Sequence, residues 1–117
     1  EKIMANKTSY LGEFEHVVML SILSLGDNAY GVTIRENLKQ AIGRDVAIGA
    51  LYSTAERLER KGLLASSKRD ATAERGGKAK RYFCVTAPGM TALEETKRHL
   101  NTLWQQLPAN KLSVIGG

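Results

Sequence analysis

The stretch GALYSTAERLERKG, residues 49–62, predicts one helix that ends at a glycine. At 100° per residue its apolar side chains share one stripe, made by Leu51, Ala55 and Leu58. The opposite face carries small, hydroxyl and guanidinium side chains: Ala50, Ser53, Arg57 and Arg60. Such a face can enter a DNA major groove, but the pattern alone is also that of an ordinary surface helix. The flanking segments have to decide between the two.

Two further helices are expected before this stretch. Residues 10–25 carry apolar side chains at helical spacing, namely Leu11, Phe14, Val18, Ile22 and Leu25. The second helix is expected over residues 31–42, with Ile34, Leu38 and Ile42 facing inward and Gly43 as its stop. The short run 45–48 is compatible with a brief strand or an extended loop. The helix over residues 31–42 and the helix over residues 49–62 are thus joined by a short connection, and two helices so joined match a helix-turn-helix unit.

After Gly62 the period changes to that of strands. Residues 63–68 and 80–86 read as a β-hairpin, and the polar loop between them contains Gly76-Gly77. The segment 68–81 holds six cations and two acids, so its net charge is +4 while the other 103 residues carry +1. Helix, turn, helix and a basic hairpin are the layout of a winged helix-turn-helix.

A long last helix is expected over residues 87–107. Thr86 is the predicted N-cap, and Pro88 lies in the first turn. One seam of this helix steps by three and four residues, through Met90, Leu93, Lys97, Leu100, Trp104 and Leu107. A winged helix does not need so long an additional helix, whereas packing against a partner subunit would explain it.

The fold class expected is therefore mainly α with a small β-hairpin, a winged helix-turn-helix plus a C-terminal dimerisation helix. We expect a flexible N-terminal segment (1–9), a DNA-binding domain (10–86), the dimerisation helix (87–108) and a tail (109–117).

Composition narrows the function classes. The chain has 117 residues, a net charge of +5 and a pI near 9.5, so one domain with an anionic partner is expected. The single cysteine, Cys84, excludes an internal disulfide and is expected to be packed in its strand. No apolar run reaches the length of a membrane span and no signal peptide is evident, so a cytoplasmic location is expected. His16 and His99 lack partners at metal-ligand spacing, and no catalytic motif is present, so neither metal, cofactor nor enzymatic activity is expected.

The ordered motifs of this chain resemble the PadR family of bacterial transcriptional regulators. The resemblance covers residues 11–93, and its carriers are Leu11-Gly12-Glu13, Tyr30-Gly31, Gly49-Ala50-Leu51-Tyr52, Arg57-Leu58-Glu59, Lys61-Gly62-Leu63, Gly76-Gly77, Arg81-Tyr82-Phe83, Val85-Thr86 and Gly89. The resemblance implies a homodimeric repressor whose third helix reads DNA and whose wing touches the DNA backbone. It also implies dimerisation through the last helix together with the first, and in some members a response to small aromatic or hydrophobic effectors.

This chain departs from the family pattern in places. Ala55 stands where a leucine is common, and the C-terminal region is a single helix, as in the short branch of the family. Trp104 does not clearly align with the tryptophan that lines the dimer pore of a multidrug-binding relative.

The residues expected to contact DNA come from three segments. They are Tyr30 and Gly31; Gly49, Ala50, Tyr52, Ser53, Thr54, Arg57, Arg60 and Lys61; and Lys68, Arg69, Arg75, Gly76, Gly77, Lys78, Lys80 and Arg81. The small residues Ala50, Ser53 and Thr54 are the favoured base contacts, because they allow a close approach. Arg57 and Arg60 are expected on phosphates, although Arg60 could instead pair with Glu56.

The expected dimer interface combines the first and last helices, through Leu11, Phe14, Val18, Leu93, Leu100, Trp104 and Leu107. Phe14 and Trp104 are the candidates for an effector pocket. The leading hypothesis is a repressor that binds near-palindromic double-stranded DNA as a homodimer, with a small aromatic or phenolic effector as an additional partner. The alternative is a winged-helix protein-interaction module whose basic hairpin binds an acidic partner.

Overall fold

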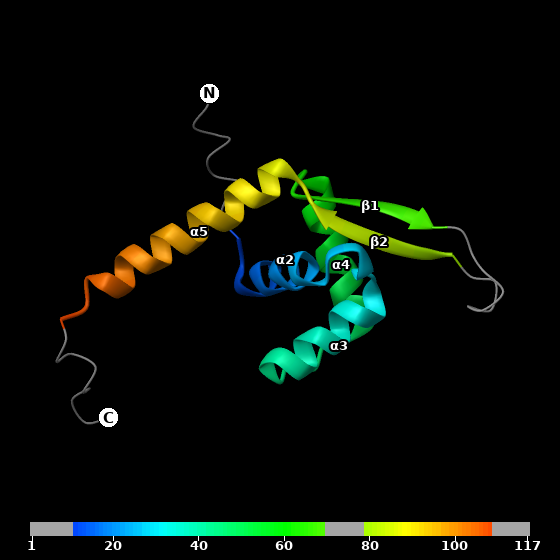
Figure 1. Ribbon diagram of the computed structural model, residues 1–117, viewed down its shortest axis with the longest axis horizontal. Helices are drawn as coiled ribbons and strands as arrows, with labels where there is room; N and C mark the ends of the chain where they lie inside the picture. The colour runs from blue at the N-terminus through cyan, green and yellow to red at the C-terminus, as the bar shows by residue number, and fades with distance from the viewer. Residues whose placement is uncertain (1–10, 70–78, 109–117) are drawn as a thin grey trace.

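The computed structural model describes residues 11–69 and 79–108. Its elements in chain order are α2 (Glu13–Leu25), the 3-10 turn η1 (Gly26–Asn28), α3 (Gly31–Ile42), α4 (Ile48–Arg60), β1 (Leu64–Arg69), β2 (Lys80–Val85) and α5 (Ala87–Gln105). Helices α2, α3 and α4 cluster together, the hairpin extends to one side, and α5 runs past α2 and beyond the helical cluster on the other (Figure 1). This is the winged helix-turn-helix with an additional helix that the sequence predicts.

The helix ends follow the glycine and threonine signals in the sequence. Gly43 and Gly62 adopt left-handed φ angles of 68° and 80°, which glycine accepts without a Cβ penalty. After α4, the Leu63 amide donates to the Leu58 carbonyl, which closes a Schellman motif. At the start of α5, the Thr86 hydroxyl accepts from the Gly89 amide at 3.1 Å. The predicted stops at Gly43 and Gly62 and the N-cap at Thr86 are confirmed.

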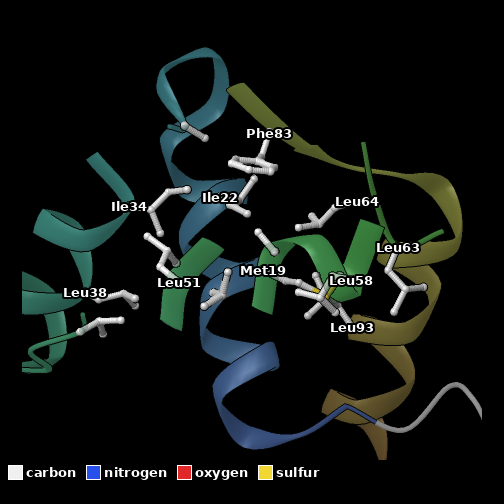
Figure 2. Packing of buried hydrophobic residues seen from close by; sticks show 14 of the residues in the cluster. Met19, Ile22, Ile34, Leu38, Leu51, Leu58, Leu63, Leu64, Phe83 and Leu93 are labelled. Atoms are coloured by element: carbon white, nitrogen blue, oxygen red, sulfur yellow. The ribbon is translucent and has the colours of Figure 1, made fainter. Parts of the chain in front are cut away.

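One hydrophobic core joins the helices to the hairpin. Met19, Leu58 and Leu93 lie together at its centre, while Phe83 reaches it from the hairpin next to Ile22 (Figure 2). All five side chains are nearly or completely buried. The core therefore holds α2, α4, β2 and the first turns of α5 in one unit, which sets the position of α4 relative to the hairpin.

The hairpin is antiparallel, and the middle of β2 is tied to residues 29–30, directly before α3. Its register pairs Leu64 with Val85 at one end and Arg69 with Lys80 at the other. The Phe83 amide donates to the Ala29 carbonyl at 2.9 Å, and Tyr30 forms an isolated bridge with Tyr82. Residues 29–30 thus bridge to β2 beside the two-stranded sheet, so that a backbone hydrogen bond connects the hairpin to the helix-turn-helix.

Several details differ from the expectations. Helix α2 begins at Glu13, Tyr10 lies outside the described residues, and residues 45–47 form a loop that leads into α4. Ile42 is 55% exposed, because the last turn of α3 extends past the core. Cys84 is also exposed, because side chains alternate along β2 and the neighbouring Phe83 is the one that points into the core. The expected loop around Gly76-Gly77, the N-terminal segment (1–9) and the tail (109–117) lie outside the described residues.

None of the described helices combines the length and the apolar character that a membrane crossing requires.

Candidate nucleic-acid interface

The N-terminal half of α4 exposes a surface of small side chains. Gly49, Ala50 and Ser53 are exposed, while Leu51 and Ala55 point into the core. No side chain of the described protein covers Gly49, because a Cβ placed there would meet no atom within 4 Å. A flat surface of this kind allows the helix to approach the edges of bases closely.

Tyr52 and Thr54 lie deeper than these residues. The ring of Tyr52 packs on the core 6.3 Å from the ring of Phe83, and its hydroxyl end lies against Gly31. A Cβ on Gly31 would lie 2.8 Å from Tyr52 Cζ, so the glycine is needed for this packing. Thr54 is only 4% exposed. It was expected among the base contacts, but it lies on the inward side of α4 and has no surface to offer a base.

Arg57 is held by partners within the protein. Its Nε donates to Glu15 Oε2 at 3.1 Å, and its Nη2 lies 3.4 Å from the hydroxyl oxygen of Thr54. The Arg57 side chain nevertheless remains 46% exposed. The guanidinium therefore has a fixed inner edge and an outer edge that faces solvent.

Glu15 is the buried centre of this group, with a side chain that is only 9% exposed. Its Oε1 accepts from the Gly12 amide at 2.9 Å, and its Oε2 accepts from Arg57 and from Lys61 Nζ, each at 3.1 Å. Burial raises the pKa of Glu15, but the hydrogen bonds from Gly12, Lys61 and Arg57 outweigh it and bring the pKa below the ordinary value. The carboxylate is therefore charged at neutral pH. Sequence reasoning did not single out Glu15; its place three residues after Gly12, as in a capping box, was the available signal.

Arg81 is also engaged, on the hairpin side of α4. Its Nη2 donates to Glu59 Oε1 at 2.7 Å and its Nε donates to the Ser66 hydroxyl at 3.0 Å. Glu56 lies 3.5 Å from the same guanidinium. Glu56 thus pairs with Arg81, and the pairing with Arg60 weighed from the sequence is not observed.

Two hairpin cations stack on tyrosine rings. Arg69 Cζ lies 3.7 Å from the ring centre of Tyr82, and Lys80 Nζ lies 4.8 Å from that of Tyr30. The two ring centres are 5.1 Å apart and the ring planes are tilted by 57°, so the four side chains form one contiguous cluster, which we call the tyrosine stack. Arg69 Nη1 also donates to the Asp27 carbonyl at 3.2 Å.

Of the other cations expected to contact DNA, Arg60 and Lys68 are exposed, and two lie outside the described residues. Within residues 11–69 and 79–108, Arg60 and Lys68 are exposed and form no ion pair. Arg75, Gly76, Gly77 and Lys78, which were expected to contact DNA, lie outside the described residues. In the described part of the chain, no three His, Cys, Asp or Glu side chains gather as metal ligands.

A groove of about 520 Å³ lies between α2 and α5, away from α4. Its apolar lining is Leu20, Leu23, Met90, Leu93, Leu100 and Trp104, and polar side chains including His16 and Lys97 complete it. The predicted seam therefore faces this groove from Met90 to Trp104, whereas Leu107 lies beyond the end of α5 and outside the groove. Trp104 is 65% exposed, and Leu103 and Leu107 beside it are exposed as well.

Some residues expected at a dimer interface are buried within the single chain. Val18 and Leu93 belong to the core and are at most 4% exposed, so they have almost no surface for a partner. Leu20 and Leu23 of the same helix are exposed in their place. Phe14 does not line the groove, and its ring instead carries the guanidinium of Arg44 at 5.3 Å. The structure therefore does not bring Phe14 and Trp104 together in one pocket.

Comparison with known proteins agrees with this architecture. The model of the PadR family, described as "Transcriptional regulator PadR-like family", matches residues 19–95. A protein of Mycobacterium tuberculosis named transcriptional regulator Rv3488 is 34% identical over 107 residues, which cover 89% of this chain and 95% of the relative.

Solved structures show the same fold. A PadR-like transcription factor from Bacteroides fragilis has a TM-score of 0.68 at 24% identity, covering 90% of this chain and 94% of that one. A PadR family transcriptional regulator from Eggerthella lenta has a TM-score of 0.64 at 28% identity, covering 80% of each chain.

Proposed function

This chain belongs to the PadR-like family of transcriptional regulators, a non-enzymatic class, and we propose that it is a repressor that binds near-palindromic operator DNA as a homodimer. The observation that carries the proposal is the surface of α4. Its small exposed residues lie on a helix whose C-terminal half, through Glu56 and Glu59, pairs with Arg81 of the hairpin. The hairpin contributes cations from both strands, including Lys68 and Lys80. In a winged helix, α4 would enter the major groove while the hairpin follows the backbone.

The proposed DNA contacts fall into two groups. Gly49, Ala50 and Ser53 approach the base edges, since they are exposed and small. Arg60, Lys68 and the outer edge of Arg57 contact phosphates, because each presents a cation to solvent on or beside α4. Arg81 contributes less than the sequence suggests, because two glutamates already neutralise it.

The proposed dimer is supported by the exposed apolar surface around the groove. Leu20, Leu23, Leu100, Leu103 and Trp104 are each more than 40% exposed. A second copy of this surface would cover them, and a twofold axis there would present two α4 helices to one side of a duplex. Half-sites about 34 Å apart, one turn of DNA, are then expected.

A small aromatic or phenolic effector that releases the DNA is a further part of the proposal. The groove volume of about 520 Å³ lies within the usual range for small-molecule sites. Trp104 is the single tryptophan of the chain and lines the groove, so its fluorescence reports on this site alone. Titration with a panel of phenols and planar aromatics should shift or quench this emission; no change with any of them would remove the effector from the proposal.

DNA binding can be tested with duplexes selected from a random-sequence pool by the wild-type protein. The expected result is a near-palindromic consensus whose affinity falls steeply with salt, by about 0.9 in log–log slope for each phosphate neutralised. Ser53→Glu should abolish binding, because the new carboxylate would face the bases and phosphates. Thr91→Glu, an exposed position on α5, is the matched control. Failure to enrich any sequence at moderate salt would contradict the proposal.

The same variants address the alternative, a module whose basic hairpin binds an acidic protein. Such a partner would contact Lys68 and its neighbours but not the side of α4 that is proposed to face the DNA bases. Binding to it would survive Ser53→Glu, whereas operator binding would not.

A further inference from the structure

We propose that Glu15 is a positioning residue for DNA recognition: it orients the guanidinium of Arg57 so that its outer edge is preset to take a backbone phosphate. This inference rests on the proposed DNA-binding function and adds a residue outside the helix-turn-helix surface to it. Glu15 itself would not touch DNA, because it is buried beneath α4.

Arg57 lies on the same face of α4 as the small exposed residues. It follows Ser53 by one turn and Ala50 by two, so the three side chains line up along the helix. All three are exposed. A duplex that contacts Ala50 and Ser53 would therefore bring its backbone close to Arg57.

The inner edge of Arg57 is held at two points. Nε donates to Glu15 Oε2, and Nη2 lies 3.4 Å from the hydroxyl oxygen of Thr54. Thr54 is itself buried. Because the guanidinium is planar, these two contacts determine the direction of its outer N–H groups. A free arginine side chain loses rotamer entropy when a phosphate immobilises it. Because Glu15 and Thr54 already hold the guanidinium, Arg57 has lost part of this rotamer entropy in the free protein, before DNA binds.

The carboxylate is suited to this role because its own position is fixed independently. Oε1 is bound to the Gly12 amide at the first turn of α2, while Oε2 receives Arg57 and Lys61 together. Its lowered pKa keeps it charged across the neutral range, so the hold on Arg57 does not vary there. Two cations share one carboxylate, so the group keeps a net positive charge facing outward.

The neighbouring carboxylate provides a matched control. Glu13 lies on the same helix but binds Arg44 at 2.7 Å, and its side chain is 70% exposed. Glu13→Gln removes a charge of the same sign two residues away without touching Arg57. It should leave DNA binding unchanged.

The test compares wild type, Glu15→Gln, Arg57→Gln and the double variant on the duplex that the wild-type protein selects. Folding is checked by circular dichroism. Glu15→Gln should weaken binding about five- to twentyfold and Arg57→Gln should do at least as much, with a salt slope lower by about one. In the Arg57→Gln background, Glu15→Gln should change the affinity less than twofold, because the group it positions is gone.

Two further measurements keep the inference falsifiable. Thr54→Val removes the second anchor of Arg57 and should weaken binding two- to fivefold even if Glu15→Gln folds poorly. The Arg57 Nε–H should give a slowly exchanging NMR signal in the free wild-type protein and lose it in Glu15→Gln.

Several outcomes would overturn the inference. Equal losses from Glu15→Gln in both backgrounds would indicate a purely structural role, and tighter binding with a steeper salt slope would mean that Glu15 withholds Arg57 from DNA. If a duplex is selected and Glu15→Gln binds it like wild type, the inference fails while the proposed function stands. If the wild-type protein selects no duplex, both fail together.

Discussion

Gly89 is a residue at which the fold has no room for a side chain. A Cβ there would overlap the Leu63 carbonyl oxygen and lie 2.8 Å from Val85 Cγ1. The Leu63 carbonyl cannot move aside, because it accepts the Thr86 amide at the junction of hairpin and α5. This glycine was recognised as part of a family motif, but the reason for it is a contact between segments 26 residues apart.

Gly89→Ala should therefore destabilise the protein by about 2–3 kcal/mol through overpacking. Gly49→Ala is the control, since a Cβ at that exposed helical position meets nothing. It should be neutral or stabilise by up to about 1 kcal/mol. Urea denaturation monitored by circular dichroism measures both, and similar stabilities for the two variants would contradict the steric argument.

Glu15 predicts a pH dependence of stability. Because its pKa is lower in the folded than in the unfolded chain, its stabilisation is complete above the ordinary glutamate pKa of about 4.3 and is lost as pH falls through the folded value. Glu15→Gln should cost about 1–2 kcal/mol at pH 7, a modest figure because Arg57 and Lys61 are partly solvated.

The difference between wild type and Glu15→Gln, read from urea midpoints, should stay constant from pH 7 to about 5 and shrink below about 4. A difference that persists undiminished at pH 3 would show that the charge of Glu15 is not what stabilises the protein.

The hairpin is the element whose position depends most on aromatic packing. Leu64, Phe83 and Tyr82 hold its base, and the tyrosine stack joins both strands to the start of α3. The hydropathy pattern predicts two strands here, and it correctly predicts that they pair. It does not predict that Arg69 and Lys80 would lie over tyrosine rings, since the rings come from different elements.

Removing one ring of the stack should loosen the hairpin where it meets α3. Tyr30→Leu should accelerate hydrogen exchange of the Phe83 amide, which donates to Ala29, about five- to tenfold, as expected for losing roughly 1 kcal/mol. The Thr86 amide, which donates to the Leu63 carbonyl where the hairpin meets α5, is the internal control and should exchange as in wild type. Equal acceleration of both amides would mean global destabilisation instead.

At the scale of the whole molecule, the apolar surface formed by α2 and α5 is left uncovered by the rest of the described chain. The second half of α5 extends beyond the helical cluster (Figure 1), and its exposed apolar side chains continue the surface of α2. Such a surface is typical of protein–protein contacts. Its lining includes Lys97, which the sequence shows as a break in the apolar seam.

Trp104→Glu should weaken the proposed dimer by about 2 kcal/mol or more, roughly thirtyfold or more in Kd, because a large aromatic contact would be replaced by a charge. Thr102→Glu adds the same charge to α5 outside the groove and should change the Kd little. Sedimentation equilibrium distinguishes the two. A wild-type protein that stays monomeric at high micromolar concentration would contradict the proposed dimer.

The sequence by itself determined the order, type and approximate ends of the elements, because helix and strand periods, the glycines at 43 and 62 and the cap at Thr86 all act over short separations. It also determined the family, through motifs in a fixed order. Only the tertiary structure decided how individual side chains are used. Arg57 and Glu15 are 42 residues apart, and Arg81 and Glu59 are 22 apart. Which cation is neutralised, stacked or left facing solvent depends on distances that exist only after the helices and the hairpin have packed.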